Sequence, residues 1–125
     1  MLLLDTHVLL AWLWNRPDLI AQGAVKAVEN PAQPVFVSSI SAFEIVTKKA
    51  LGKLTVPDDL EEQIKGHGFT ELPFSIAHSA AASKLPAIHR DPFDRMLIAQ
   101  ALTENLILVT GDGDIQKYDV SILKA

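Results

Sequence analysis

The sequence predicts an α/β fold with a central, mostly parallel sheet of four to five strands that helices cover on both faces. The order of the segments along the chain carries this prediction. Apolar segments of strand length alternate with longer segments of helical periodicity, which is typical of βαβ units, and such units build parallel sheets that are buried on both faces. The 125 residues contain no repeat, low-complexity stretch or linker, so we expect one domain over residues 1–125.

The first half of the chain supplies two of the expected strands. Leu2–Leu4 is a short apolar run, and Pro34–Val37 is rich in β-branched and aromatic residues, so both are typical of buried strands. The remaining segments have helical spacing and are bounded by residues that break helices. We expect helices at about 8–15, 20–29, 41–51 and 58–65, with breaks at Pro17, Pro31, Gly52 and Gly66.

The second half supplies the other strands and two further helices. Strands are expected at 69–74 and 106–110, with a short fifth candidate at 120–123, and helices at 75–85 and at about 91–104. Because parallel strands are joined by right-handed crossovers, the carboxyl ends of all strands share one edge of the sheet. Ligands bind at that edge in such folds, near the point where the strand order reverses.

Composition excludes several classes of protein. The chain carries 11 Lys and Arg against 15 Asp and Glu, a formal charge of −4, which argues against coating nucleic acid by bulk charge. It has no Cys, which excludes thiolate catalysis and Cys-ligated metal centres and fits a reducing cytoplasm. The apolar start lacks the marks of a signal peptide, and no run is long enough to span a bilayer. We therefore expect a cytoplasmic protein without a membrane partner.

Acidic residues gather at the expected carboxyl edge. Four lie next to strand ends or in first helical turns, and two flank them: Asp5, Glu44, Asp94 and Asp112, with Asp91 and Asp114 beside the last two. Carboxylates packed together repel, so some must be protonated or a cation must neutralise them. Oxygen-only ligands suit Mg²⁺ or Mn²⁺. One or two such ions can activate water for in-line displacement at phosphorus, which is phosphodiester hydrolysis.

Most of these acids also have a local structural interpretation. Ser41-Ala-Phe-Glu44 fits a capping box, Asp91-Pro92 fits an N-cap followed by proline, and Asp94 suits the positive end of a helix dipole. Residues 111–114 have a sequence that is typical of an ordinary turn. Asp5 alone has no expected cap or turn to serve, so a buried carboxylate there would be costly unless paired. The convergence of these acids at one edge favours a functional site.

Basic residues cluster near the same edge and are candidate phosphate contacts: Lys48, Lys49, Arg90 and Arg95, with Lys53 nearby. They would offset the acidic pocket locally, so that an anionic backbone could approach it. The alternatives are an i,i+4 ion pair between Glu44 and Lys48 and a solvated surface position for Arg95.

The remaining side chains that could take part in binding or catalysis give weaker signals. His7 could line the site and His89 could touch a phosphate, but no histidine spacing supports zinc. Trp12 and Trp14 are expected as core or subunit contacts rather than base-stacking platforms. The chain has no Gly-rich nucleotide loop and no Gly-x-Ser-x-Gly elbow, so nucleotide cofactors and serine hydrolysis have no support.

Four motifs, in this order along the chain, resemble the PIN-domain family, and most closely the VapC-type toxins of bacterial toxin–antitoxin pairs. They are Leu-Leu-Asp5-Thr6, Ser41-Ala-Phe-Glu44-Ile, Asp91-Pro-Phe-Asp94-Arg-Met-Leu-Ile-Ala-Gln-Ala101 and Leu108-Val-Thr-Gly-Asp112. The resemblance spans nearly the whole chain. It implies a three-layer α/β/α sandwich and a ribonuclease activity that depends on Mg²⁺ or Mn²⁺.

The resemblance also implies roles for particular residues. The acidic quartet of the family falls on Asp5, Glu44, Asp94 and Asp112, and Thr6 and Thr110 match supporting hydroxyl positions. Arg95 matches a commonly basic position. Asp114 is a second candidate for the fourth acid, although the strand-end spacing favours Asp112, and Asp91 is a cap rather than a ligand. Family members usually form homodimers, and a small antitoxin protein often occupies the acidic groove.

The leading hypothesis is therefore a metal-dependent endoribonuclease that uses one or two ions and acts as the toxin of a toxin–antitoxin pair. The alternative is a catalytically inactive module of the same fold that binds a partner protein or RNA, although such a module has no reason to keep four repelling carboxylates. A third possibility, an aspartyl-phosphate phosphotransferase, lacks the second Asp expected two residues after Asp5.

Overall fold

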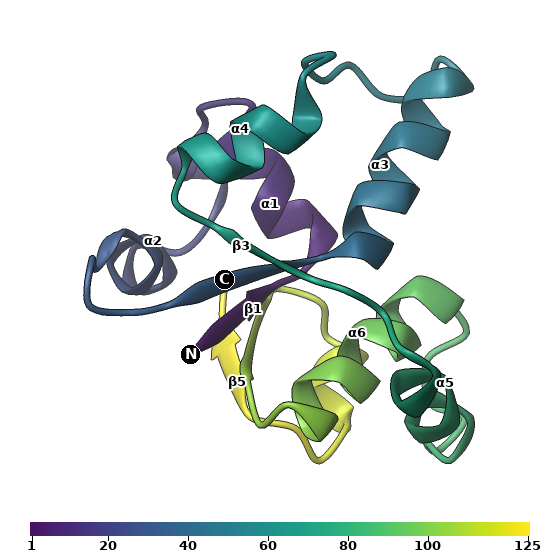
Figure 1. Cartoon of the computed structure of the whole chain (residues 1–125). Helices are drawn as coiled ribbons and strands as arrows, with labels where there is room; N and C mark the ends of the chain where they lie inside the picture. Colours follow the sequence, from purple (N-terminus) through teal and green to yellow (C-terminus); the bar gives the residue numbers. More distant parts are fainter.

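A five-stranded sheet runs through the middle of the molecule (Figure 1). The structure is a computed structural model that describes residues 1–125. The strands are β1 (Leu2–Leu4), β2 (Val35–Ser38), β3 (Thr70–Leu72), β4 (Ile107–Thr110) and β5 (Ile122–Lys124), in the order β3-β2-β1-β4-β5. Every neighbouring pair is parallel. The predicted α/β fold with a parallel sheet is confirmed.

Helices cover both faces of this sheet. They are α1 (Thr6–Leu13), α2 (Gln22–Glu29), α3 (Ser39–Ala50), α4 (Leu60–Gly66), α5 (Ile76–Ser83) and α6 (Pro92–Thr103), with short 3₁₀ turns η1 (Pro17–Leu19) and η2 (Ile115–Lys117). Figure 1 shows α1, α3 and α4 on one side of the sheet and α5 and α6 on the other.

Two apolar cores lie between the three layers, and β1 contributes to both. Leu2 and Leu4 pack into the core under α1 and α3, whereas Leu3 points into the core under α6. Because successive side chains of a strand point to opposite faces, a strand covered on both sides must be apolar throughout. This explains why the central strands read as continuous apolar runs rather than as alternating ones.

The strand order reverses between β1 and β4, which are neighbours in the sheet but more than a hundred residues apart in the chain. The register sets Leu4 beside Val37 on one side and beside Val109 on the other. The residues that follow these positions therefore meet at one edge, which we call the carboxyl edge. None of the helices combines the length and the apolar character that crossing a membrane would require.

Two helices begin earlier than the sequence predicts. Helix α1 begins at Thr6 rather than Val8, because the Asp5 side chain accepts a hydrogen bond from the Val8 amide and caps it. Helix α3 begins at Ser39 rather than Ser41, because Ser38 accepts a hydrogen bond from the Ile40 amide. The fifth strand lies at Ile122–Lys124, slightly later than expected.

Candidate active site

The carboxyl edge contains a cleft of about 260 Å³, which we call the acidic cleft. Helices α1, α3 and α6 and the loops after α3 and β4 supply its walls. Five of its thirteen lining residues are carboxylates: Asp5, Glu44, Asp91, Asp94 and Asp112. The fold therefore brings the four acids of the predicted quartet, and Asp91, to one cavity.

Asp5 lies between β1 and α1 and is 3% exposed. Its Oδ1 accepts a hydrogen bond from the Val8 amide at 3.0 Å, and its Oδ2 accepts one from the Thr110 hydroxyl at the end of β4. Burial raises the pKa of Asp5, and these two hydrogen bonds oppose the rise. The expectation that Asp5 has no cap to serve is wrong, because α1 begins directly after it.

Glu44 is 7% exposed and lies in the second turn of α3. Its Oε1 accepts a hydrogen bond from the Thr6 hydroxyl at 2.8 Å, and its Oε2 accepts one from Lys48 Nζ at 2.7 Å. The capping-box interpretation of Glu44 is excluded, because Ser38 rather than Ser41 caps this helix. The Glu44–Lys48 ion pair at i,i+4 spacing is present as the sequence suggests.

Asp94 lies in the first turn of α6, and its side chain is 18% exposed. Burial, together with the negative charges of Asp91, Asp112 and Asp5, raises the pKa of Asp94 from 3.8 to about 7. Asp91 caps the same helix, since its Oδ1 accepts a hydrogen bond from the Phe93 amide at 2.9 Å. The interpretation of Asp91 as a cap is therefore correct, and its carboxylate also lines the acidic cleft.

Asp112 follows β4 and lines the acidic cleft, whereas Asp114 does not. Asp112 Oδ1 accepts hydrogen bonds from the amides of Asp114 and Ile115 at 2.8 and 3.0 Å. Despite its partial burial, the pKa of Asp112 is lowered by these bonds and by a bond with His89. Asp114 is exposed and pairs with Lys117 at 3.1 Å, and ligand atoms of His89, Asp112 and Asp114 lie within 4.8 Å of one another.

His89 lies beside the site, where the sequence suggested a phosphate contact, but its contacts with two carboxylates were not predicted. Its Nδ1 accepts a hydrogen bond from the Asp91 amide at 3.1 Å, so Nε2 carries the ring proton. Nε2 lies 3.0 Å from Asp94 Oδ2 and 3.2 Å from Asp112 Oδ2. Burial acts to lower the pKa of His89, but the bond with Asp112 and the nearby charges raise it overall. A second ring proton would have to displace the Asp91 amide, which opposes that rise.

Most of the predicted phosphate contacts have other partners. Lys48 binds Glu44, and Lys49 binds Asp58 outside the acidic cleft. Arg90 is exposed on the loop before α6 and does not line the cleft. Lys53, which lines the cleft without an ion pair, is the basic residue best positioned to meet an anionic ligand.

Arg95, which was predicted as a phosphate contact, makes its hydrogen bonds within the chain. Its Nη1 donates to the carbonyl of Pro86 at 2.8 Å, and its Nη2 donates to the carbonyls of Ala82 and Leu85 at 3.1 and 3.2 Å. The Tyr118 hydroxyl donates to Pro86 as well and accepts the His89 amide at 2.8 Å. Arg95 and Tyr118 therefore hold the loop that brings His89 against Asp94 and Asp112.

The donor set of the acidic cleft fits a hard divalent cation. Asp5, Glu44, Asp94 and Asp112 offer carboxylate oxygens, and the chain contains no thiol. The raised pKa values of Asp5 and Asp94 reflect carboxylates that are poorly solvated. A cation would favour the ionised form of each.

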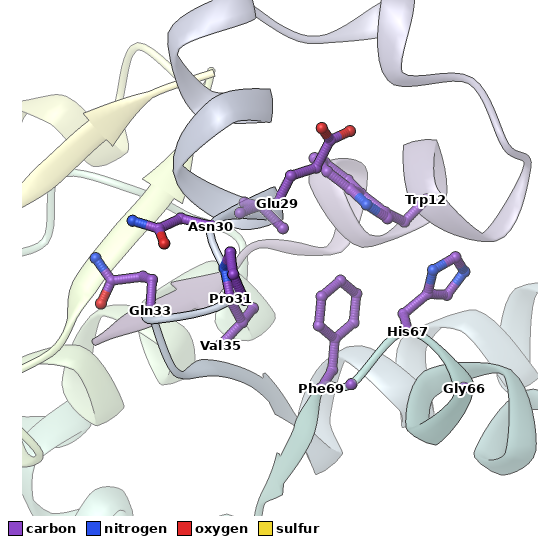
Figure 2. Close-up of a pocket in the computed structure, with 11 residues that line it drawn as sticks. Trp12, Glu29, Asn30, Pro31, Gln33, Val35, Gly66, His67 and Phe69 are labelled. Atoms are coloured by element: carbon purple, nitrogen blue, oxygen red, sulfur yellow. The ribbon is translucent and has the colours of Figure 1, made fainter.

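A larger hollow, of about 530 Å³, lies at the opposite edge of the sheet, where β2 and β3 begin (Figure 2). Trp12 and Phe69 meet there edge to face, with ring centroids 6.4 Å apart, and the His67 ring stacks on Phe69 at 5.5 Å. Glu29 is its one carboxylate. We call it the amino-edge hollow; it holds no group of converging acids.

Comparison with known protein families gives one match over most of the chain. A family model described as "PIN domain" matches residues 2–121. A search among curated protein sequences found no match.

Solved structures share the fold. A chain in the structure of DNA-bound VapBC from Salmonella typhimurium superposes with a TM-score of 0.74 at 17% identity, over 98% of this chain and 96% of that chain. A chain in the structure of VapBC2 from Rickettsia felis, bound to a DNA fragment from its promoter, has a TM-score of 0.69 at 15% identity. The match covers 99% of this chain and 98% of that chain. A chain in a toxin–antitoxin complex from Klebsiella pneumoniae has a TM-score of 0.68 at 19% identity, over 99% of this chain and 97% of that chain. At these identities the likenesses establish the fold alone.

Proposed function

Since the chain belongs to the PIN domain family, whose members are in general nucleases, we propose that it is an endoribonuclease that depends on Mg²⁺ or Mn²⁺. We further propose that it is a VapC-type toxin of a toxin–antitoxin pair. The observation that carries the nuclease proposal is the convergence of Asp5, Glu44, Asp94 and Asp112 in one cleft. These four residues come from four separate segments of the chain.

The energetics of this cluster support a metal site rather than a structural network. A structural network of buried acids is expected to pair each carboxylate with a cation or with several donors. Here Lys48 pairs with Glu44, but the acid with the largest pKa change, Asp94, meets one ring N–H and three other carboxylates. Keeping these groups together costs stability, and a divalent cation offsets that cost.

In this proposal the four acids hold the cation, and Thr6 and Thr110 keep Glu44 and Asp5 oriented through their hydroxyl groups. When bound, the ion supplies a polarised water and offsets charge on the phosphate. Hydrolysis adds the water oxygen to phosphorus and releases the ribose oxygen of the neighbouring nucleotide. Lys53, which lines the same cleft from the loop after α3, can offset the charge of the RNA backbone.

The proposal is tested by cleavage of single-stranded RNA with Mn²⁺ and with a chelator. We expect Asp5→Asn and Asp94→Asn each to lower the rate on the order of 10²–10³-fold, the effect of removing one electrostatic group from an active site. Glu29→Gln is the matched control, because it also removes one carboxylate but in the amino-edge hollow. Undiminished cleavage by both cleft variants would overturn the proposal.

A calorimetric titration separates this function from the inactive-module alternative. We expect wild-type protein to bind Mn²⁺ or Mg²⁺ and Asp94→Asn to bind it more weakly. If millimolar Mn²⁺ and Mg²⁺ do not bind and RNA is not cut, the inactive interaction module is the better description. The same titration gives the number of ions, which distinguishes a one-ion site from a two-ion site.

The proposed partners are an antitoxin protein and a second copy of this chain. The structural neighbours come from toxin–antitoxin complexes, which supports the first. Support for a homodimer comes from apolar side chains on α3, since Phe43 is 58% and Val46 is 46% exposed, and from the Phe43–Phe93 contact beside the cleft. Light scattering after size exclusion tests the dimer, and Phe43→Asp should shift it to monomer.

A further inference from the structure

We propose that the far end of the acidic cleft binds the base of a nucleotide adjacent to the scissile phosphate, and that Trp14 determines the preference for that base. This inference rests on the proposed ribonuclease function and names a substrate subsite within it. The far end is formed by apolar residues and one cation: Leu10, Trp14 and Leu54 with Lys53.

Helix α1 connects the two ends of the cleft. Thr6, Leu10 and Trp14 recur every four residues, so they lie along one face of the helix, and all three line the cleft. Thr6 contacts Glu44 at the acidic end, and Trp14 is the C-cap at the other end. Eight helical residues span about 12 Å. The cleft therefore continues beyond the acids, over a length that a flanking nucleotide can occupy.

Trp14 is exposed but held in one orientation. Its indole Nε1 donates to the carbonyl of Thr55 at 2.7 Å, although the residue is 41% exposed. Thr55 belongs to the loop after α3 that also carries Lys53 and Leu54, so the helix end and the loop form the far end together. A fixed aromatic ring loses little entropy on binding, and bases stack on such rings in single-strand-binding proteins.

The two tryptophans of the chain have different environments. Trp12 is half-buried and packs edge to face on Phe69, against the core on the far side of the helix (Figure 2). That arrangement agrees with the expected core contact. Trp14 instead borders the cleft, and its indole is bonded to the Thr55 carbonyl rather than packed against the core.

The charges at the far end favour a nucleotide over an apolar side chain of a partner protein. Lys53 is exposed, lines the cleft and makes no ion pair, so it is available for a phosphate oxygen next to the stacked base. No side-chain amide or carboxylate lines this end, so the base edge has no hydrogen-bond partner to read it. Selection must then follow stacking strength, and the larger ring system of a purine stacks more strongly than that of a pyrimidine.

Cleavage kinetics test this with short single-stranded oligoribonucleotides that differ in the base next to the cut. Stacking is worth about 1–3 kcal/mol per base, or about 5- to 150-fold in affinity. We expect Trp14→Leu to raise KM by roughly tenfold with kcat little changed, and to abolish the purine preference. Trp14→Phe should retain much of both. Leu102→Ala, which alters a side chain on α6 of similar exposure, 44%, should change neither.

A fluorescence titration gives a readout that does not require cleavage. In the Trp12→Phe background Trp14 is the only tryptophan, and we expect these oligoribonucleotides to quench its emission by stacking. Unchanged KM and base preference in Trp14→Leu, without quenching, would overturn the proposal while wild-type cleavage leaves the ribonuclease function standing. That result would assign the far end to a protein partner. If wild-type protein neither cuts RNA nor binds Mn²⁺, the ribonuclease function fails, and absence of quenching in the same titration overturns the subsite as well.

Discussion

The two edges of the sheet carry hollows of opposite character. The amino-edge hollow, about 530 Å³, has aromatic walls and one carboxylate. The acidic cleft has about half that volume, 260 Å³, and gathers five carboxylates. Helices α1 and α6 begin at the acidic cleft, whereas α2 and α4 end at the amino-edge hollow. Free N–H groups at helix starts favour anions, and helix ends do not.

This difference teaches that the size of a hollow is a poor guide to its chemistry. The larger hollow arises where helix ends and strand starts leave space around packed rings. The smaller one contains charges that repel each other, and the fold holds them against that repulsion. Sites of function are where a fold keeps an arrangement that costs stability. Four predictions test whether the two edges are independent, from the largest expected effect to the smallest.

The largest effect on stability is expected at the amino edge. Phe69 is 6% exposed and contacts Trp12, so Phe69→Ala should lower the free energy of unfolding by about 3–5 kcal/mol. Urea denaturation measures this loss, and calorimetry should show Mn²⁺ affinity unchanged in the folded variant. Weaker Mn²⁺ binding by folded Phe69→Ala would mean that the two edges are coupled.

A stabilising effect is expected at the carboxyl edge. The pKa of Asp94 is about 7 in the folded chain, against an ordinary value of 3.8. The protonated carboxyl therefore contributes to stability fully below pH 3.8, and this contribution is lost as the pH rises through 7. Without metal, Asp94→Asn should therefore be more stable than wild type at pH 8, by up to about 4 kcal/mol. The difference should be small at pH 4. If Asp94→Asn and wild type were equally stable at both pH values, the ionised Asp94 carboxylate would not destabilise the fold.

Metal should stabilise the protein through the acidic cleft alone. At a Mn²⁺ concentration of 100 Kd, the free energy of unfolding should rise by about 2.7 kcal/mol. Thermal denaturation should show this rise in wild type and Glu29→Gln, and at the same Mn²⁺ concentration it should be largely lost in Asp94→Asn. It should weaken as the pH falls below 7, because a proton on Asp94 competes with the ion. An equal rise in Asp94→Asn would place the bound ion elsewhere.

The smallest effect is expected at the loop between α5 and α6, which carries Pro86 and His89. The Tyr118 hydroxyl accepts the amides of Ile88 and His89 and donates to the carbonyl of Pro86. Tyr118→Phe should cost about 1–2 kcal/mol and weaken Mn²⁺ binding a few-fold, because His89 is then less well held against Asp94 and Asp112. Calorimetry on folded Tyr118→Phe checks this, and unchanged affinity would show that the loop does not position the site.

The strands, the parallel sheet and the edge at which the acids meet can be predicted from the sequence, because they follow from hydrophobic periodicity and from the geometry of βαβ units. The contacts of Arg95 and His89 cannot be predicted in this way. Both depend on how the loop before α6 folds back on Tyr118, which lies about thirty residues further along the chain. No local pattern encodes such a contact. The cap formed by Asp5 was missed because the helix start was expected two residues too late.

The hydrogen bond between Thr110 and Asp5 joins residues 105 positions apart, and this separation has a consequence for the timing of activity during synthesis. A ribosome adds about 5–20 residues per second, and contacts between distant segments form last. β1 has no β4 to pair with, and Asp5 has no Thr110 or Asp112 beside it, until nearly nine-tenths of the chain has been made. A chain that ends before Asp112 therefore cannot assemble the acidic cleft, and the proposed cleavage of RNA must wait until β4 and the loop after it have been made.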